Sequence, residues 1–349
     1  MTTSWRFPLF VALLMATLAV PSRPIFAEDV ASKPITVTVG NFIRAETDTY
    51  FRSTVKDGGF GKLKHRHDMA SIDKQDVVRM NRDTLYSSGV FDLDAGPVAI
   101  TLPDAGKRFM SMQVISEDHY TVDVVYDPGP HSYSRNTVGT RYAFVIVRTL
   151  ADSRSSEDMK LANALQDAIR VAQATTGTFE VPDWEPKSQA KVRDALAVLG
   201  SLHGDDKAQM FGSKAEVDPV AHLIGTSIGW GGNPPSAAIY QSVYPKSNDG
   251  RTVYRLTVKD VPVDGFWSIS VYNGKGFFEK NKIGAYSLNS LTAKPSSDGS
   301  FTIQFGACEK PSPNCLPIMR DWNYTVRMYR PHAAILRGEW TFPEAKPIK

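Results

Sequence analysis

Residues 76–148 carry a series of short, strand-like segments, and this series constrains the fold more than any other feature of the sequence. The segments are rich in β-branched and aromatic residues and are separated by turn-forming Asp, Pro and Gly. They are Val77–Met80, Leu85–Phe91, Val98–Leu102, Phe109–Ile115, Tyr120–Tyr126 and Tyr142–Arg148. Short strands at such spacing predict an antiparallel β-sandwich.

A helical block and a second strand-rich region follow. Apolar residues at helical spacing predict one helix over 156–172, a second from Pro186 to Gly200, and a third that starts near Asp218. Five strands are then expected at Ile239–Tyr244, Val253–Val258, Phe266–Tyr272, Phe301–Phe305 and Trp322–Tyr329. The chain is therefore predicted to be mainly β, with two tandem antiparallel β-sandwich domains and a helical connecting segment.

This pattern divides the chain into five parts. They are a signal peptide at 1–27, an N-terminal strand and helix at 28–56, the first β-sandwich domain at 57–150, a mainly helical connecting segment at 151–234 and the second β-sandwich domain at 235–349. A mature length of about 320 residues is enough for two domains of ordinary size, each with its own core.

The first 27 residues have the pattern of a secretory signal peptide. Arg6 precedes the apolar run Phe7–Val20, which is shorter than the roughly 20 residues that a membrane span needs. The small residue Ala27 precedes the expected cleavage point, and an uncleaved anchor is the alternative. We expect an exported, periplasmic protein without an integral membrane span, because no later segment is apolar for long enough.

Positive and negative residues are interspersed and nearly balanced. Removal of the signal peptide removes Arg6 and Arg23 from the 40 basic residues and none of the 37 acidic residues, so 40 − 2 = 38 basic residues remain. A protein that binds phosphate backbones normally has a basic surplus. Nucleic acid is therefore not an expected partner.

The chain has two cysteines, Cys308 and Cys315. One close pair in an exported chain favours a disulfide, which we expect to close a loop at a hairpin tip. Two free thiols, or half of a metal site, are the alternative, and no nearby histidine completes a ligand set.

The two strand-rich regions resemble each other. The matched segments are Thr84–Phe91 with Ala238–Tyr244, Ile100–Asp104 with Leu256–Asp260, and Phe109–Val114 with Phe266–Val271. Three matches in the same order at nearly constant offset predict a duplicated sandwich. The copies differ where Asn81-Arg82-Asp83 of the first corresponds to Pro235-Ser236-Ala237 of the second, so the fold does not itself require the polar cluster.

Two polar clusters interrupt the first strand series, and we predict that together they form a ligand-binding site. The predicted site residues are Asn81, Asp83, Tyr86, Asp118, His119 and Tyr120. Strand alternation places Asn81 and Asp83 on one face, and Asp118 and His119 fall at a turn, where loops carry function on a rigid scaffold. If the clusters converge, a carboxylate beside His119 would favour the imidazolium, or the acids and His119 could hold a divalent metal.

A purely structural explanation of these residues stays open. Asp83 could cap a turn, and Asp118 and His119 could form a solvated hairpin tip. His65 and His67 would share one face of a strand and could share a metal, but they lie among basic residues in what has the pattern of a solvated loop. No metal or cofactor is predicted.

Several motifs resemble those of one bacterial family. They are MNRDTLYSSGVFDL, the strand pair that ends in EDHY, VPVDGFWSISVYN, and NCLP followed by VRMYRP. Together they are similar to exported bacterial proteins that pair an N-terminal domain of unknown function 1254 with a C-terminal domain of unknown function 1214. The resemblance covers nearly all of the mature chain and implies two jelly-roll-like β-sandwich domains, with no assigned activity.

No motif in the sequence names a reaction. The His-Glu-x-x-His zinc motif, the phosphate-binding glycine loop and Cys-x-x-Cys are all absent. The favoured interpretation is a periplasmic protein that binds a polar small molecule or glycan at a site in the first β-sandwich. The alternatives are a carboxylate- or metal-dependent hydrolase or lyase, and a structural or assembly protein. Whether the protein is an enzyme stays open, and a homo-oligomer is compatible with the sequence.

Overall fold

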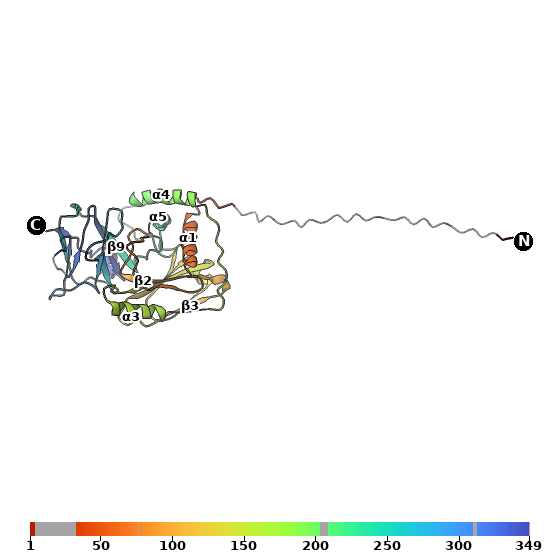
Figure 1. Cartoon of the computed structure of the whole chain (residues 1–349), viewed down its shortest axis with the longest axis horizontal. Helices are drawn as coiled ribbons and strands as arrows, with labels where there is room; N and C mark the ends of the chain where they lie inside the picture. The colour runs from red at the N-terminus through yellow and green to blue at the C-terminus, as the bar shows by residue number, and fades with distance from the viewer. Residues whose placement is uncertain (4–32, 76, 203–208, 310–312, 349) are drawn as a thin grey trace. The chain divides into compact units, whose positions relative to one another are not determined.

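Two pairs of β-sheets form the framework of the chain (Figure 1). The computed structural model describes residues 1–3, 33–75, 77–202, 209–309 and 313–348, so most of the predicted signal peptide lies outside the described residues. Residues 34–349 belong to one compact unit. The prediction of a mainly β protein with antiparallel sheets is confirmed, whereas the jelly-roll connectivity stays a prediction.

The N-terminal sheet pair consists of a five-stranded sheet, β1-β2-β7-β4-β5, and a three-stranded sheet, β6-β3-β8, with antiparallel pairing throughout. The strands are β1 Lys64–Arg66, β2 Thr84–Asp92, β3 Val98–Leu102, β4 Met110–Ser116, β5 Thr121–Val125, β6 Gly129–Tyr133, β7 Tyr142–Leu150 and β8 Arg170–Gln173. Alternate side chains from the two sheets, such as Met112, Val145 and Ile100, share one buried apolar core.

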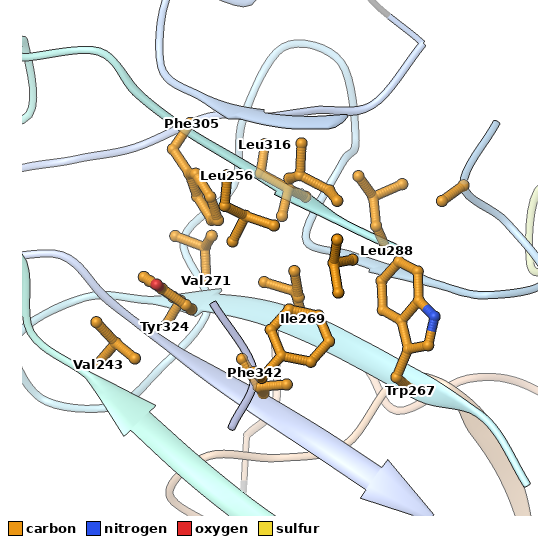
Figure 2. Packing of buried hydrophobic residues seen from close by; sticks show 14 of the residues in the cluster. Val243, Leu256, Trp267, Ile269, Val271, Leu288, Phe305, Leu316, Tyr324 and Phe342 are labelled. Atoms are coloured by element: carbon orange, nitrogen blue, oxygen red, sulfur yellow. The ribbon is translucent and has the colours of Figure 1, made fainter. Parts of the chain in front are cut away.

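The C-terminal sheet pair consists of two four-stranded sheets, β12-β11-β15-β9 and β14-β13-β10-β16. The strands are β9 Ala238–Val243, β10 Tyr254–Val258, β11 Trp267–Tyr272, β12 Ser287–Asn289, β13 Phe301–Phe305, β14 Cys315–Leu316, β15 Asn323–Tyr329 and β16 Lys346–Pro347. Figure 2 shows Leu256 and Phe305 of one sheet above Ile269 and Tyr324 of the other. These side chains form the second core.

Helices cover the N-terminal sheet pair, and one short helix near the end of the chain packs on the C-terminal core instead. They are α1 Phe42–Lys56, α2 Arg135–Val138, α3 Ser156–Asp167, α4 Pro186–Leu202, α5 Pro219–Gly229 and α6 Ala333–Leu336. In Figure 1, α1, α4 and α5 lie on one side of β2 and α3 lies on the other. Phe51 of α1 stacks on Phe144 of β7 at 5.7 Å between ring centroids, which seals one face of the five-stranded sheet.

Local signals place the helix starts. Ser155 caps α3 by accepting from Asp158 N, and Asp218 caps α5 by accepting from two backbone N–H groups. The helix predicted over 156–172 ends earlier, because residues 170–173 pair with β3 as strand β8. Residues 77–80, predicted as a strand, form none, and Arg79 there has a φ of 54°.

The two sheet pairs repeat one strand order. In the first, β2-β7-β4 corresponds to β9-β15-β11 of the second, and β6-β3-β8 corresponds to β13-β10-β16. Tyr86 of β2 pairs with Arg148 of β7, and Tyr240 of β9 pairs with Arg327 of β15. Strand order and register thus repeat as the internal sequence similarity predicted.

Cys308 and Cys315 form a disulfide, as predicted, with Cα atoms 5.7 Å apart. The expected hairpin is wrong, because β14 pairs in parallel with β13. The disulfide-bonded loop therefore connects β13 to β14, which runs beside it in the same direction.

Replacement of both cysteines by alanine is expected to lower the free energy of unfolding by about 2.5 kcal/mol, because the unfolded chain gains the entropy of a short open loop. Urea unfolding of both proteins measures the difference. Reduction of the wild-type protein should cause a similar loss, and an unchanged midpoint in the double variant would contradict the prediction.

Candidate functional site

The predicted cluster at 81–83 joins the two sheet pairs. Its contacts are Asn81 Nδ2 to Tyr329 Oη at 3.2 Å, the Arg82 guanidinium over the Tyr286 ring at 5.5 Å, and Asn289 Nδ2 to Asp83 Oδ1 at 3.1 Å. All three partners belong to the C-terminal half. The corresponding residues of the second copy, 235–237, are not polar in this way. The structure describes two sheet pairs, so there is no further pair for these residues to join.

Asp83 is fully buried beside a second buried charge, Arg327. Burial raises the pKa of the Asp83 carboxyl, and the positive charge of Arg327 opposes that shift. The Arg327 guanidinium donates to Ser270 Oγ at 3.0 Å, to Tyr272 Oη at 2.7 Å and to the Arg79 carbonyl at 2.8 Å. This joint therefore offsets a buried cation with a buried acid and several neutral acceptors.

Three tyrosine hydroxyls meet near this joint. Asn81 Oδ1 accepts from the Asp83 N–H at 2.8 Å, so its Nδ2 faces Tyr86 Oη at 3.0 Å and Tyr329 Oη. Asn233 Nδ2 likewise donates to Tyr240 Oη at 2.8 Å. An amide nitrogen can only donate, so the phenol oxygens are placed to accept, and Thr84 Oγ1 at 3.2 Å is a third acceptor for the two N–H groups of Asn81. Within the described part of the chain, none of the three hydroxyls donates its own proton to another residue.

Arg148 lies beside these hydroxyls. Its guanidinium stands 5.9 Å from the centre of the Tyr86 ring and donates to Gln113 Oε1 at 2.9 Å and to the Gly231 carbonyl at 3.0 Å. The residue is only 5% exposed. Among the residues that the structure describes, no carboxylate lies within 4.0 Å of it. Buried charges are normally paired, so a cation with only neutral acceptors is unusual.

These side chains share one environment, which we call the junction site. It consists of Asn81, Tyr86, Arg148, Asn233, Tyr240 and Tyr329. Burial raises the pKa of Tyr329 well above its ordinary value, and the neighbouring Tyr240 and Tyr86 raise it further. Tyr240 is 38% exposed, so the junction site reaches solvent.

The second predicted cluster lies at the turn between β4 and β5. Asp118 accepts from Arg44 of α1 at 2.5 Å, and the Tyr120 ring stacks on His222 of α5 at 4.8 Å. His119 is buried, with 3% exposure, so the alternative of a solvated hairpin tip does not hold for this residue. The neighbouring Asp118 does face solvent in part.

His119 is a neutral imidazole with both ring nitrogens satisfied. The Gly231 N–H donates to Nε2 at 2.8 Å, so Nδ1 carries the proton and donates to Thr226 Oγ1 at 2.8 Å. Burial lowers the pKa of His119 well below its ordinary value, and the nearby His222 lowers it further. The carboxylate-paired imidazolium that convergence of the clusters would create is therefore not formed, because Asp118 turns to Arg44 instead.

The six predicted residues thus occupy two clusters. Within the described ranges, no hydrogen bond or ion pair joins Asn81, Asp83 or Tyr86 to the turn at 118–120. The segment 229–233, which we call the glycine strap, connects the two clusters. The Gly231 N–H donates to His119, and the Gly231 carbonyl accepts from Arg148, which lies beside Tyr86. A site shared by all six residues stays a prediction.

Nucleophile-like spacings have mainly helical surroundings. Gly225–Gly229 fits Gly-x-Ser-x-Gly but lies within α5, where Ser227 Oγ donates to the Ile224 carbonyl at 2.9 Å. Ser53–Lys56 in α1 and Ser188–Lys191 in α4 fit Ser-x-x-Lys, and a third such spacing, Ser71–Lys74, lies outside the helices. A nucleophile elbow needs a strand–turn–helix, so the first spacing is not an elbow.

A cavity of about 300 Å³ opens beside the second cluster. Its charged lining residues are Arg44, Glu117, Asp118, Arg135, Arg141 and Glu180. Each of these charges has an oppositely charged neighbour. In the described ranges, no group of three or more His, Cys, Asp or Glu residues is arranged to hold a metal ion, and no helix is long and apolar enough to cross a membrane.

Sequence reasoning found Asn81 and Tyr86 but missed Arg148. A single arginine at the end of an apolar strand has the pattern of an exposed residue. The signal that could have found it is the repeat, because Val147-Arg148 and Val326-Arg327 occupy the same position on equivalent strands.

Asp48 of α1 is buried, and its Oδ2 accepts from Trp184 Nε1 at 2.8 Å. Burial raises the pKa of Asp48 to about 6. The folded protein therefore holds this proton more tightly than the unfolded chain does, and it loses up to about 3 kcal/mol of stability as the pH rises from about 4 to above 6. Asp48→Asn keeps an acceptor for Trp184 and is expected to abolish that loss.

Urea unfolding at several pH values between 4 and 7 measures this effect. The exposed Asp104→Asn is the matched control and should follow the wild type. The same pH slope in Asp48→Asn and in the wild type would contradict the prediction.

His119→Ala is expected to lower the free energy of unfolding by about 2–4 kcal/mol, because it leaves the Gly231 N–H without its acceptor and opens a cavity. Thermal and urea unfolding measure the change. His332→Ala, at an exposed histidine, should have little effect. If both variants unfold like the wild type, His119 does not hold the glycine strap.

Comparison with known proteins agrees with this architecture. The VPA0106 protein from Vibrio parahaemolyticus has a similar crystal structure, with a TM-score of 0.69 and 20% identity over 89% of this chain and 97% of that chain. An uncharacterised protein from Burkholderia cenocepacia has a TM-score of 0.52 and 13% identity over 89% of this chain and 87% of that chain. Both similarities concern the fold alone, and no curated protein sequence matches the chain.

Two family matches complete the comparison. Residues 60–132 match the family described as "Protein of unknown function (DUF1254)", and residues 243–333 match "Protein of unknown function (DUF1214)". The first match lies in the N-terminal sheet pair and the second in the C-terminal sheet pair. The chain therefore carries DUF1254 followed by DUF1214, in the order that the sequence resemblance predicted.

Proposed function

We propose that the protein binds a small polar molecule at the junction site. The observation that carries this proposal is the set of donors there: three phenol hydroxyls that already accept from amides, and the buried guanidinium of Arg148. A ligand rich in hydrogen-bond acceptors would satisfy all of these donors. A surface that served only to join the two halves would be expected to pair them with acceptors from the chain.

The surroundings of the junction site support recognition of a ligand. Its tyrosines and Arg148 come from strands of both sheet pairs, and its two asparagines come from the segments before β2 and β9. Tyr126 stands at the same edge, with the Arg330 guanidinium 4.6 Å from its ring centre. Aromatic rings combined with a few well-placed polar groups are typical of small-molecule sites.

The proposal keeps part of the site expected from the sequence. Asn81 and Tyr86 contribute directly, and Asp83 supports Asn81 through its backbone N–H. We further propose that the mature chain acts in the periplasm after removal of residues 1–27. Catalysis by paired acids gains no support from Asp83 and Asp118, because each is engaged elsewhere, with Asn289 and with Arg44.

A thermal-shift screen of sugars, sugar acids, other carboxylates and nucleotides should find a stabilising compound. A ligand at 100 times its dissociation constant adds about 2.7 kcal/mol of stability. Calorimetry on Tyr86→Phe and Tyr240→Phe should then show affinity losses of about threefold to tenfold each, because each variant loses one O–H donor.

Tyr244→Phe provides the matched control. Tyr244 is exposed, and its hydroxyl accepts from Arg79 at 2.6 Å, outside the junction site. Its affinity should equal that of the wild type. A screen without any stabilising compound, or hits whose affinity is the same in all three variants, would reject the junction site.

A further inference from the structure

The internal repeat places two arginines at equivalent positions. Arg148 of β7 pairs with Tyr86 on one side and with Ser111 on the other, and Arg327 of β15 pairs with Tyr240 and with Ser268 in the same way. Both arginines are at least nine-tenths buried. The two positions therefore carry the same combination of tyrosine, arginine and serine, and they differ in what covers them.

The chain itself provides Arg327 with a negative charge. The segment before β2 covers this arginine: the Arg79 carbonyl accepts from it at 2.8 Å, and the buried Asp83 carboxylate lies close enough for its charge to be felt, although the two form no ion pair within 4.0 Å. Tyr272 accepts a further hydrogen bond from the guanidinium. The cost of burying this cation is offset within the protein.

Among the described residues, Arg148 has no such charged neighbour in an ion pair. The glycine strap lies over it and offers the Gly231 carbonyl, while β4 offers the Gln113 amide oxygen. Both acceptors are neutral, and no carboxylate of the described residues lies within 4.0 Å. Among the described residues neither arginine forms an ion pair within 4.0 Å, but Arg327 has the buried Asp83 as a charged neighbour, whereas the side-chain and backbone groups that accept from Arg148 are neutral.

We infer that the ligand of the junction site carries a carboxylate, which takes the place of the Gly231 carbonyl on the Arg148 guanidinium. This inference rests on the proposed function and adds the charge of the ligand. A planar guanidinium presents parallel N–H groups that match two carboxylate oxygens. The free protons of Tyr86, Tyr240 and Tyr329 can donate to the remaining lone pairs.

The glycine strap is suited to release its carbonyl. Gly231 has a φ of 77°, and a Cβ atom there would meet nothing within 4 Å. The side of Gly231 on which a Cβ atom would stand is therefore open, and release of its carbonyl requires only that the Gly232 N–H leave the Gly229 carbonyl, which accepts from it at 3.0 Å. A carboxylate would replace a neutral acceptor with a charged one, and charge-assisted hydrogen bonds are roughly twice as strong.

The charges around the junction site also favour an anion. Arg330 stands at its edge beside Tyr126. Burial raises the pKa of Tyr126, and the positive charges of Arg330 and Arg148 oppose that shift. Arg330 has one ion-pair partner in the described part of the chain, the exposed Asp264 at 3.9 Å.

Matched pairs of compounds test the inference by calorimetry. We would use glucuronate with glucose, benzoate with benzamide, and succinate with succinamide, so that each pair differs mainly in the charge of one or two groups. The acid that binds should do so at least about tenfold more tightly than its neutral partner. Arg148→Gln should lower the affinity for that acid by roughly 100-fold. Arg255→Gln, at an exposed arginine of β10, should leave the affinity unchanged.

Arg148→Lys is the second variant, in case Arg148→Gln fails to fold. Lysine keeps the charge but loses the planar fork, so an intermediate loss of affinity is expected. If the acids and their neutral partners bind equally tightly, the inference that the ligand carries a carboxylate is overturned, and the proposed function stays in place. If none of the six compounds binds and the general screen finds no stabilising compound, both the carboxylate inference and the proposed function are overturned.

Discussion

The structure depends on the buried polar joint between residues 81–83 and the C-terminal sheet pair. A buried carboxylate or guanidinium is costly alone, so Asp83 and Arg327 are accommodated only when both halves are folded and docked. Asn289 and Tyr329 add hydrogen bonds with defined directions. We interpret the joint as the contact that fixes how the two halves meet, and hence where residues from both form the junction site.

The joint also explains how two copies of one architecture came to differ. The same Tyr–Arg pair occurs in each, at Tyr86 and Arg148 and at Tyr240 and Arg327. In the second copy, a segment of the first half covers the arginine with an acid. In the first copy, the glycine strap covers it with carbonyl groups only. Identical strand positions therefore have different chemistry, because their covering segments differ.

Much of the fold could be predicted, because its signals are local. Alternate residues of β15, Tyr324, Val326 and Met328, enter the C-terminal core as their sequence pattern indicates, although the residues between them are buried too. Ser155 caps its helix in the expected way. Asn81 and Tyr86 could be suspected because polar residues interrupt a strand-rich stretch. Arg148 could not, since its burial results from the strap and from β4 rather than from its neighbours in sequence.

The sequence by itself determined the mainly β class, the order of the two domain families, the helix caps and the disulfide pair. These features depend on residue types within a few positions of one another. Only the tertiary structure decided the partners of the polar groups: Asp118 contacts Arg44, His119 stays neutral against the glycine strap, and Arg148 donates to the Gly231 carbonyl. The partners in these contacts are separated by 74, 112 and 83 residues, respectively, and no local pattern encodes contacts over such distances.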